Sequence, residues 1–342
     1  NPTLIKAYLK DEGVLAKARG LAAQGLAQEQ TYFALLKDLA STVINVFKQY
    51  DVNGKFSVEL DPTKATDIAA SVKEAINWTN IAPEYMMVKV AATKEGYKII
   101  EEVTALGRNV NATLIFTPEQ YQEVASAYIR GLTRAAQAGI GLKDIYSVAS
   151  FFISRWDVKL AKQIPENYQG MFANAVAIDA YNRIFTPVFS SAEFKALEEK
   201  GARRQDFLLA STGSKASDII KSLTPEGVAE QQKAQIQTQV KAQYPEDVYV
   251  AQVQGPYVVN TLPYETVQYL INTGVRPEAT IISNYPLAQE LLVTMQAKTN
   301  LQQAGEELFS AGMQSFINDF SDVQTTIAKI VEQAKPATRD NP

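Results

Sequence analysis

Short apolar runs alternate with helical patterns along the chain from Phe56 onward. Each run is rich in β-branched or aromatic residues and is followed by a turn or helix signal, which is typical of parallel strands covered on both faces. We therefore predict a repeated strand–helix order. The six predicted strands are residues 56–60, 86–91, 109–116, 146–155, 206–212 and 248–254.

Capping signals mark the helices between these runs. Thr117 is followed by Pro118 and by Gln120, which gives an N-cap, a proline at the first helical position and a capping box, so a helix should run from here to Gly139. The other predicted helical segments are 3–50, with loops at Gly13 and Gly20, 190–201, 263–274 and 287–334.

The repeated order places the chain in the α/β class. No Gly-rich motif such as G-x-G-x-x-G follows the first predicted strand, which favours a (β/α)8 TIM barrel over a Rossmann sheet. We expect one barrel domain over residues 1–342, with residues 221–246 as a surface helical insertion and residues 335–342 as a polar tail. Six strands leave such a barrel two strands short.

Composition removes several kinds of chemistry. The chain has no Cys and no His, which excludes a thiolate nucleophile, a disulfide, an imidazole base, a Ser-His-Asp triad and a His-ligated zinc. Any reaction must therefore use Lys, Asp, Glu, Tyr, Ser, Thr, Arg or main-chain groups.

Charge and hydropathy indicate the kind of partner. Lys+Arg number 33 and Asp+Glu 37, for a net charge of −4, and neither sign forms a long run. We expect no nucleic-acid partner and no membrane partner.

No apolar stretch approaches the roughly 18 residues of a membrane span, and the N-terminus lacks a signal-peptide pattern. We expect a soluble, cytoplasmic protein that is a monomer or a homodimer.

Polar side chains recur with one parity inside four successive predicted strands. In a barrel strand one parity of side chains points inward, so these residues should line the interior. The four sets are Ser57, Glu59 and Asp61; Lys89; Asn111 and Thr113; and Ser150, Phe152 and Ser154.

Lys89 is the strongest catalytic candidate. A lysine near a strand end can simply extend its ammonium group to water, but a buried amine loses its charge readily and can form a Schiff base with a ketone or aldehyde. Glu59 is either the ion-pair partner of this cation or a carboxylate for proton transfer, and the two roles are compatible. The side chains of Asn111 and Thr113 could simply form hydrogen bonds with each other or with main-chain groups inside the barrel.

A second candidate group lies at the ends of the next two strands. Arg155 ends the predicted strand 146–155, and the turn Ser211-Thr212-Gly213-Ser214-Lys215 ends the strand after it. An arginine, hydroxyl groups, a lysine and main-chain N–H groups that converge at strand ends suit a phosphate.

The motifs in these strands resemble those of the transaldolase family, specifically its longer bacterial form. The family motifs run in the same order along nearly the whole chain. The matching segments are Asn1-Pro2-Thr3, S-V-E-L-D-P from Ser57, V-K-V-A-A-T-K-E-G from Val88, N-A-T-L-I-F from Asn111, S-V-A-S-F-F-I-S-R from Ser147, A-S-T-G-S-K from Ala210, and G-P-Y-V-V-N-T-L-P from Gly255.

The resemblance implies a role for each candidate residue in the transfer of a dihydroxyacetone unit from a ketose phosphate to an aldose phosphate, in the pentose phosphate pathway, without metal or organic cofactor. Lys89 would form the Schiff base, and Glu59 would assist proton transfers through a water. The remaining roles would be orientation of the lysine and that water by Asn111 and Thr113, a lining of the site by Ser150 and Phe152, a hydrogen bond to the dihydroxyacetone unit from Asn1, and phosphate binding by Arg155, Ser211 and Lys215.

Two departures from the family pattern alter the expectation. Ala91 stands where the family usually has Pro. The family's catalytic aspartate lies on the first barrel strand, upstream of the segment that matches Asn1, so we expect roughly 30 further residues there to complete the barrel. The alternatives are a related Schiff-base aldolase that releases free dihydroxyacetone and a barrel that binds sugar phosphates without turnover.

Overall fold

The computed structural model describes residues 1–334, so the expected polar tail 335–342 lies outside the described residues. The chain divides into two compact units. Unit 1 is Asn1–Val90 together with the described residues from Gly312 onward, and unit 2 is Ala91–Ala311. That both units belong to one barrel domain stays a prediction. No helix within residues 1–334 combines the length and the apolar character needed to cross a membrane.

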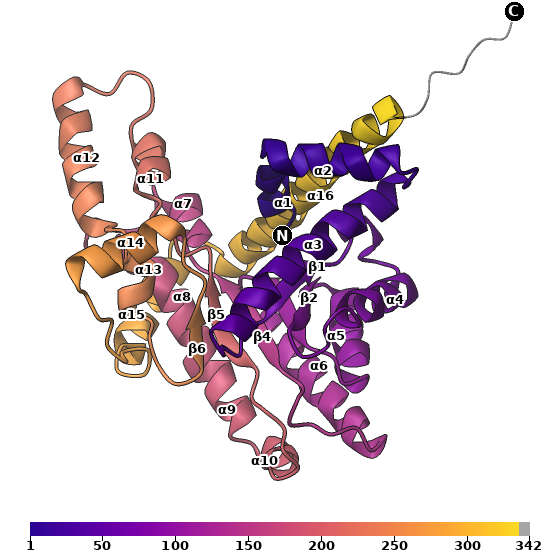
Figure 1. The fold of residues 1–342 in the computed structure, drawn as a ribbon. Coiled ribbons are helices and arrows are strands. Elements are labelled where there is room, and N and C mark those ends of the chain that lie inside the picture. The colour runs from indigo at the N-terminus through magenta and orange to yellow at the C-terminus, as the bar shows by residue number, and fades with distance from the viewer. Residues whose placement is uncertain (335–342) are drawn as a thin grey trace, which may run out of the picture. The chain divides into compact units, whose positions relative to one another are not determined.

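Unit 1 holds two parallel strands and a set of long helices (Figure 1). The strands are β1 (Phe56–Glu59) and β2 (Met86–Ala91), which pair in a register that sets Glu59 opposite Lys89. The helical elements are α1 (Pro2–Tyr8), α2 (Glu12–Ala23), α3 (Gln28–Gln49), the 3-10 helix η1 (Pro62–Lys64), α4 (Ile68–Thr79) and the end of α16 (Leu301–Ala334).

Unit 2 holds four parallel strands that lie side by side in chain order. They are β3 (Val110–Ile115), β4 (Ser147–Phe152), β5 (Asp206–Ala210) and β6 (Val258–Asn260). The helical elements are α5 (Lys94–Ala105), α6 (Pro118–Gln137), α7 (Arg155–Leu160), η2 (Glu166–Tyr168), α8 (Phe172–Ala180), the π-helical turn η3 (Tyr181–Phe185), α9 (Thr186–Phe189), α10 (Ala192–Glu198), α11 (Ala216–Leu223), α12 (Glu230–Gln243), α13 (Val248–Ala251), α14 (Tyr264–Thr273) and α15 (Tyr285–Gln296).

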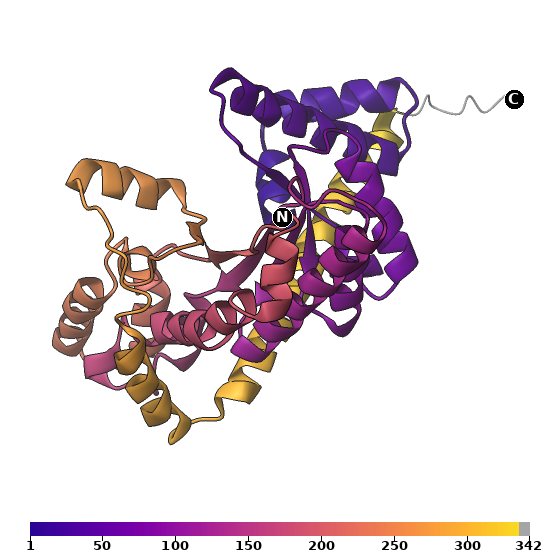
Figure 2. The same ribbon diagram turned by 90° about the horizontal axis from the view of Figure 1, so that it is seen from below.

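Helices alternate with the parallel strands, which confirms the α/β class expected of a TIM-barrel family. The described residues form six strands, and these do not close into a barrel. Within unit 2, α5 packs on α6 and α8 on α15 (Figure 1). By contrast, α14 has Thr266 as its one buried residue and stands apart from neighbouring helices of the unit in Figure 2.

Five of the six predicted strands are confirmed, the strand 86–91 with its exact bounds and the other four with ends shifted by one to three residues. The prediction of a strand at 248–254 is wrong, because this segment contains helix α13, and the strand lies instead at Val258–Asn260. Val248, Tyr249 and Val250 are all buried. A short run of consecutive apolar residues fits a buried helical turn as well as a buried strand, so its period does not decide between them.

The predicted helix boundaries are mostly confirmed. Helix α6 begins after Thr117 with the expected capping box, and α14 lies between Pro263 and Gly274. Residues 3–50 contain several helices, as predicted, but the predicted loops at Gly13 and Gly20 are wrong because both glycines lie inside α2, and the breaks fall at residues 9–11 and 24–27. An isolated glycine costs a helix only about 1 kcal/mol, which tertiary packing overrides.

Candidate active site

Lys89 and Glu59 face each other at the ends of two adjacent parallel strands of unit 1. The parallel register pairs them directly, and Lys89 Nζ lies 3.6 Å from Glu59 Oε2. Both side chains are largely shielded from water, with exposures of 12% for Lys89 and 5% for Glu59. Glu59 Oε2 has no hydrogen-bond partner among the described residues. An amine and a carboxylate therefore meet in a place of low dielectric, where their interaction is strong.

Phe316 and Asn1 also lie near the Lys89 amine. The ring centre of Phe316, on α16, is 5.8 Å from Lys89 Nζ, within the range of a cation–π contact. The sequence predicted that Phe316 is helical but held no signal for the strand residue it would face. The main-chain nitrogen of Asn1 lies within electrostatic range of Lys89 and Glu59, whereas the Asn1 side-chain oxygen accepts from Leu4 N at 2.9 Å as the N-cap of α1.

The end of β2 is held by the first turn of α5. Thr93 caps this helix and accepts a hydrogen bond from Gly96 N at 2.8 Å. A Cβ atom on Gly96 would lie 1.9 Å from the carbonyl oxygen of Ala91, so only glycine allows the helix to approach the strand end this closely. One residue further, Ala92 N donates to the Thr113 carbonyl at 2.9 Å. These contacts fix the segment that follows Lys89.

Unit 2 brings together the candidates on β3 and β4. Asn111, Thr113, Ser150 and Phe152 are all buried. Ser150 Oγ donates to Asn111 Oδ1 at 2.7 Å, whereas Thr113 Oγ1 has no hydrogen-bond partner among the described residues. The next residue, Leu114, has a φ of 58°, and the pairing of β3 with β4 shifts register there. A buried hydroxyl without a partner beside an unusual backbone conformation is a feature of functional sites.

Arg155 is the first residue of α7, so the prediction that it ends the strand is wrong. The chain follows β5 for two residues beyond β4, through bonds from Ile153 N to Ala210 O and from Ser154 N to Ser211 O, but Ser154 already has helical dihedral angles. The Arg155 guanidinium lies over the Phe152 ring at 5.4 Å. It is half-buried, burial lowers its pKa, and it forms no ion pair with a carboxylate of the described chain.

The turn 211–215 follows β5 and is tied to its surroundings by hydroxyl groups. Ser211 Oγ lies 2.9 Å from Ser154 Oγ, and the Ser211 backbone has a φ of 59°. Thr212 and Ser214 donate to the carbonyl groups of Thr261 and Tyr244, at 2.5 and 2.8 Å. Lys215 is half-buried and is the N-cap residue of α11. Arg155 thus begins its helix beside the turn that carries the other predicted phosphate-binding residues.

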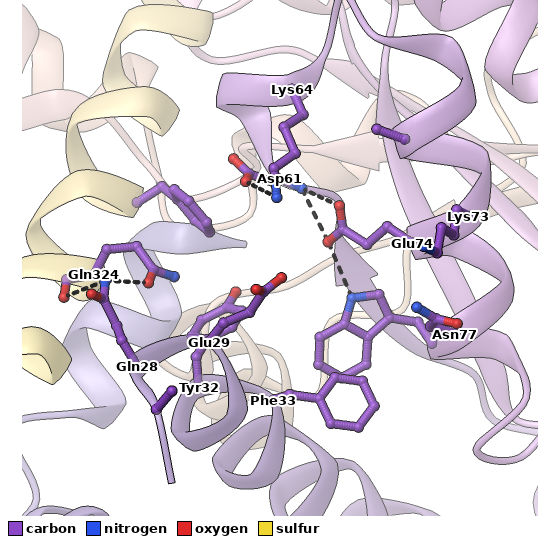
Figure 3. Close-up of a pocket in the computed structure, with 14 residues that line it drawn as sticks. Gln28, Glu29, Tyr32, Phe33, Asp61, Lys64, Lys73, Glu74, Asn77 and Gln324 are labelled. Atoms are coloured by element: carbon purple, nitrogen blue, oxygen red, sulfur yellow. Dashed lines mark hydrogen bonds and ion pairs between the residues drawn. The ribbon is translucent and has the colours of Figure 1, made fainter. Parts of the chain in front are cut away.

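Unit 1 also has a separate pocket of about 690 Å³ between α3, α4 and α16 (Figure 3). Its wall includes Phe33 stacked on Trp78, and Glu74 accepts hydrogen bonds from the Trp78 indole and from Asp61 N. Asp61, which was predicted to line the barrel interior, is among its lining residues, but no residue with a predicted catalytic or binding role is. Within residues 1–334, no group of three or more acidic side chains is placed to hold a metal ion.

The comparisons with known proteins agree with the motifs. A family model described as transaldolase/fructose-6-phosphate aldolase matches residues 1–327. The transaldolase of Thermobifida fusca is 30% identical to this chain, over 96% of it and 86% of the relative. The transaldolase of Mycobacterium bovis (strain BCG / Pasteur 1173P2) is 31% identical, over 80% of this chain and 71% of the relative. Because the family model spans almost the whole described chain, the chain belongs to the transaldolase/fructose-6-phosphate aldolase family.

Proposed function

We propose that this chain acts as a transaldolase through a Schiff base on Lys89. The observation that carries the proposal is the Lys89–Glu59 pair, an amine 3.6 Å from a carboxylate with both side chains shielded from water. Its place on adjacent strand ends of a transaldolase-family chain supports this reading.

The reaction uses the amine as nucleophile and the imine as electron sink. Lys89 Nζ adds to the C2 carbonyl of the ketose, and loss of water gives an iminium ion. Removal of the C4 hydroxyl proton then breaks the C3–C4 bond, its electron pair passes into the iminium, and an aldose phosphate leaves. Addition of the remaining three-carbon unit to another aldose phosphate, followed by hydrolysis, restores Lys89. Glu59 transfers protons through a water during the loss and return of water.

The group around Arg155 would bind the substrate phosphate. Its guanidinium is half-buried without a carboxylate partner in the described chain, so an incoming anion would supply the missing charge. Ser211 adds a hydroxyl and Lys215 a point charge. For Asn1, Asn111, Thr113, Ser150 and Phe152 we keep the roles that the family resemblance implies.

The same proposal covers the setting of the reaction. The substrates are sugar phosphates of the pentose phosphate pathway, and the enzyme is cytoplasmic. We propose one barrel domain, active as a monomer or a homodimer, without nucleic-acid partners.

Borohydride trapping tests the imine. Incubation of the full-length protein with fructose 6-phosphate and borohydride should add a reduced three-carbon unit to the peptide that carries Lys89, and mass spectrometry locates it. Lys89→Met should abolish the adduct. Lys64→Met is the matched control, because Lys64 also lies beside a carboxylate, Asp61 at 3.1 Å, but its side chain is 49% exposed. An adduct that survives Lys89→Met would refute the proposal.

The same assay separates transaldolase from aldolase activity. With fructose 6-phosphate alone, a transaldolase keeps the three-carbon unit on Lys89, whereas an aldolase releases dihydroxyacetone at every turnover.

Glu59→Gln should retain the fold and slow turnover by roughly 10²-fold, the scale of a positioned acid–base group. Turnover at the wild-type rate would leave Glu59 a purely structural role.

A further inference from the structure

Asp157 is a buried carboxyl group that the proposed reaction does not use. It lies in the first turn of α7, two residues after Arg155, and is fully buried. It forms no ion pair with any described residue. Burial raises the pKa of Asp157 to about 7, against the opposing effect of its two hydrogen bonds. An apolar side chain would occupy this position at lower cost, unless the carboxyl group is needed for what it holds.

The carboxyl group joins three helices. One oxygen accepts from Ala173 N at 3.0 Å, and this N–H lies in the first turn of α8, whose own cap residue Met171 provides no side-chain bond. The other oxygen accepts from the Tyr249 hydroxyl on α13 at 3.0 Å. Asn174 of α8 completes the triangle by donating to the Val248 carbonyl at 2.8 Å. Helices α7, α8 and α13 lie together in Figure 1.

Both parts of the phosphate-binding group attach to this cluster. Arg155 begins the same helix that carries Asp157. The turn 211–215 is attached through Ser214, which donates to the carbonyl of Tyr244 shortly before α13. The turn also meets α7 directly, through Ser211 and Ser154. A displacement of α13 would therefore move the turn relative to the guanidinium.

We infer that Asp157 and Tyr249 are positioning residues for the phosphate-binding group. They do not touch the phosphate but set the distance between Arg155 and the turn 211–215. The inference rests on the proposed function, because it takes this group as the phosphate site. A bidentate contact between arginine and phosphate is sensitive to displacements of a fraction of an ångström, so a loosened cluster weakens binding of the phosphate rather than the chemistry at Lys89.

Tyr249→Phe is the central test, and Tyr146→Phe is its matched control. The Tyr146 hydroxyl donates to Asp206, another carboxyl group whose pKa burial raises. Asp206 begins β5, however, so this second pair lies at the opposite end of the strand from Ser211. Each variant removes one hydroxyl from one Tyr–Asp pair, which is fully buried for Tyr249 and half-buried for Tyr146. The readouts are KM and kcat for fructose 6-phosphate and for unphosphorylated fructose, and inhibition by inorganic phosphate.

We expect Tyr249→Phe to raise KM for fructose 6-phosphate and the inhibition constant of inorganic phosphate by about threefold to tenfold, the effect of one lost hydrogen bond. Its kcat/KM for fructose should stay within about twofold, and Tyr146→Phe should change neither phosphate readout by more than about twofold. Asp157→Asn can still accept from Ala173 N and donate to Tyr249. It should therefore leave KM for fructose 6-phosphate and the inhibition constant of inorganic phosphate near their wild-type values, whereas Asp157→Ala should raise both.

A double variant separates this inference from the proposed function. In an Arg155→Ala background, Tyr249→Phe should cause no further loss of phosphate affinity, because the positioned group is already gone. An additive loss, or equal effects of Tyr249→Phe and Tyr146→Phe, would overturn the positioning role. If Arg155→Ala itself leaves phosphate affinity unchanged, the phosphate site and this inference both fail, while trapping at Lys89 still decides the imine.

Discussion

Lys89 in unit 1 and Arg155 in unit 2 differ in how the protein balances their positive charges. Lys89 has the carboxylate of Glu59 at 3.6 Å, whereas Arg155 rests on the face of Phe152 without a carboxylate among the described residues. An arginine without a carboxylate partner can attract an anion. These environments agree with the roles we propose, in which Lys89 reacts and Arg155 binds the phosphate.

Asp157 gives the protein a pH-dependent stability. Its pKa is about 7 in the folded protein and near the ordinary 3.8 in the unfolded chain. The folded state thus holds more protons between these values, and its stability falls as pH rises from about 4 to about 7. Asp157→Asn removes this titration. The free energy of unfolding of the wild type should therefore fall by up to about 4 kcal/mol relative to that of the variant between these pH values. Urea unfolding at several pH values measures it; a wild type that gains relative stability would contradict the assignment.

The sequence predicts some site residues better than others. Strand parity and the family motifs indicated Lys89 and Glu59, because parallel neighbours with shared parity meet at the same level of a sheet. Phe316 and the Asp157–Tyr249 pair escaped prediction. Phe316 reaches the amine from a distant helix, and Tyr249 lies in the segment that was wrongly predicted as a strand. Contacts of this kind depend on tertiary placement, for which no local pattern exists.

At the scale of elements, caps predicted boundaries better than apolar runs did. The capping box at Thr117 placed α6 correctly because its hydrogen bonds are local. Runs such as 146–155 were too long, because the apolar residues continue past the strand into the buried start of α7. Burial is common to both elements, so hydrophobicity alone could not show where the strand stopped.

The contact between α5 and the end of β2 allows a test with two glycines. Gly96→Ala places a methyl group 1.9 Å from the Ala91 carbonyl oxygen, and the backbone must shift. We expect this substitution to lower the free energy of unfolding by about 1 to 3 kcal/mol or more. Gly20→Ala, on an exposed position of α2 with nothing within 4 Å, should instead gain about 0.5 to 1 kcal/mol. The free energy of unfolding in urea measures both, and effects of the same sign would contradict the close approach.

At the scale of the whole molecule, the sequence predicted the fold class and the family, and the structure and the comparisons confirm both. The ordered motifs made this possible because six of the seven lie at a strand, whereas the segment at Asn1 begins helix α1. The division into two units was not predicted. It reflects how densely each part of the chain contacts itself, and a one-dimensional pattern of polar and apolar residues does not record that density.

The division into two units can be followed by fluorescence, because each unit contains one tryptophan. The chain has two of them: Trp78 in unit 1, bonded to Glu74, and Trp156 in unit 2, bonded to the Phe116 carbonyl. Both are buried, so the fluorescence of each should shift to the red when its surroundings unfold. Trp156→Phe then leaves an emitter in unit 1, and Trp78→Phe one in unit 2. A single cooperative domain requires coincident urea transitions in the two variants, and separate midpoints would assign each unit its own stability.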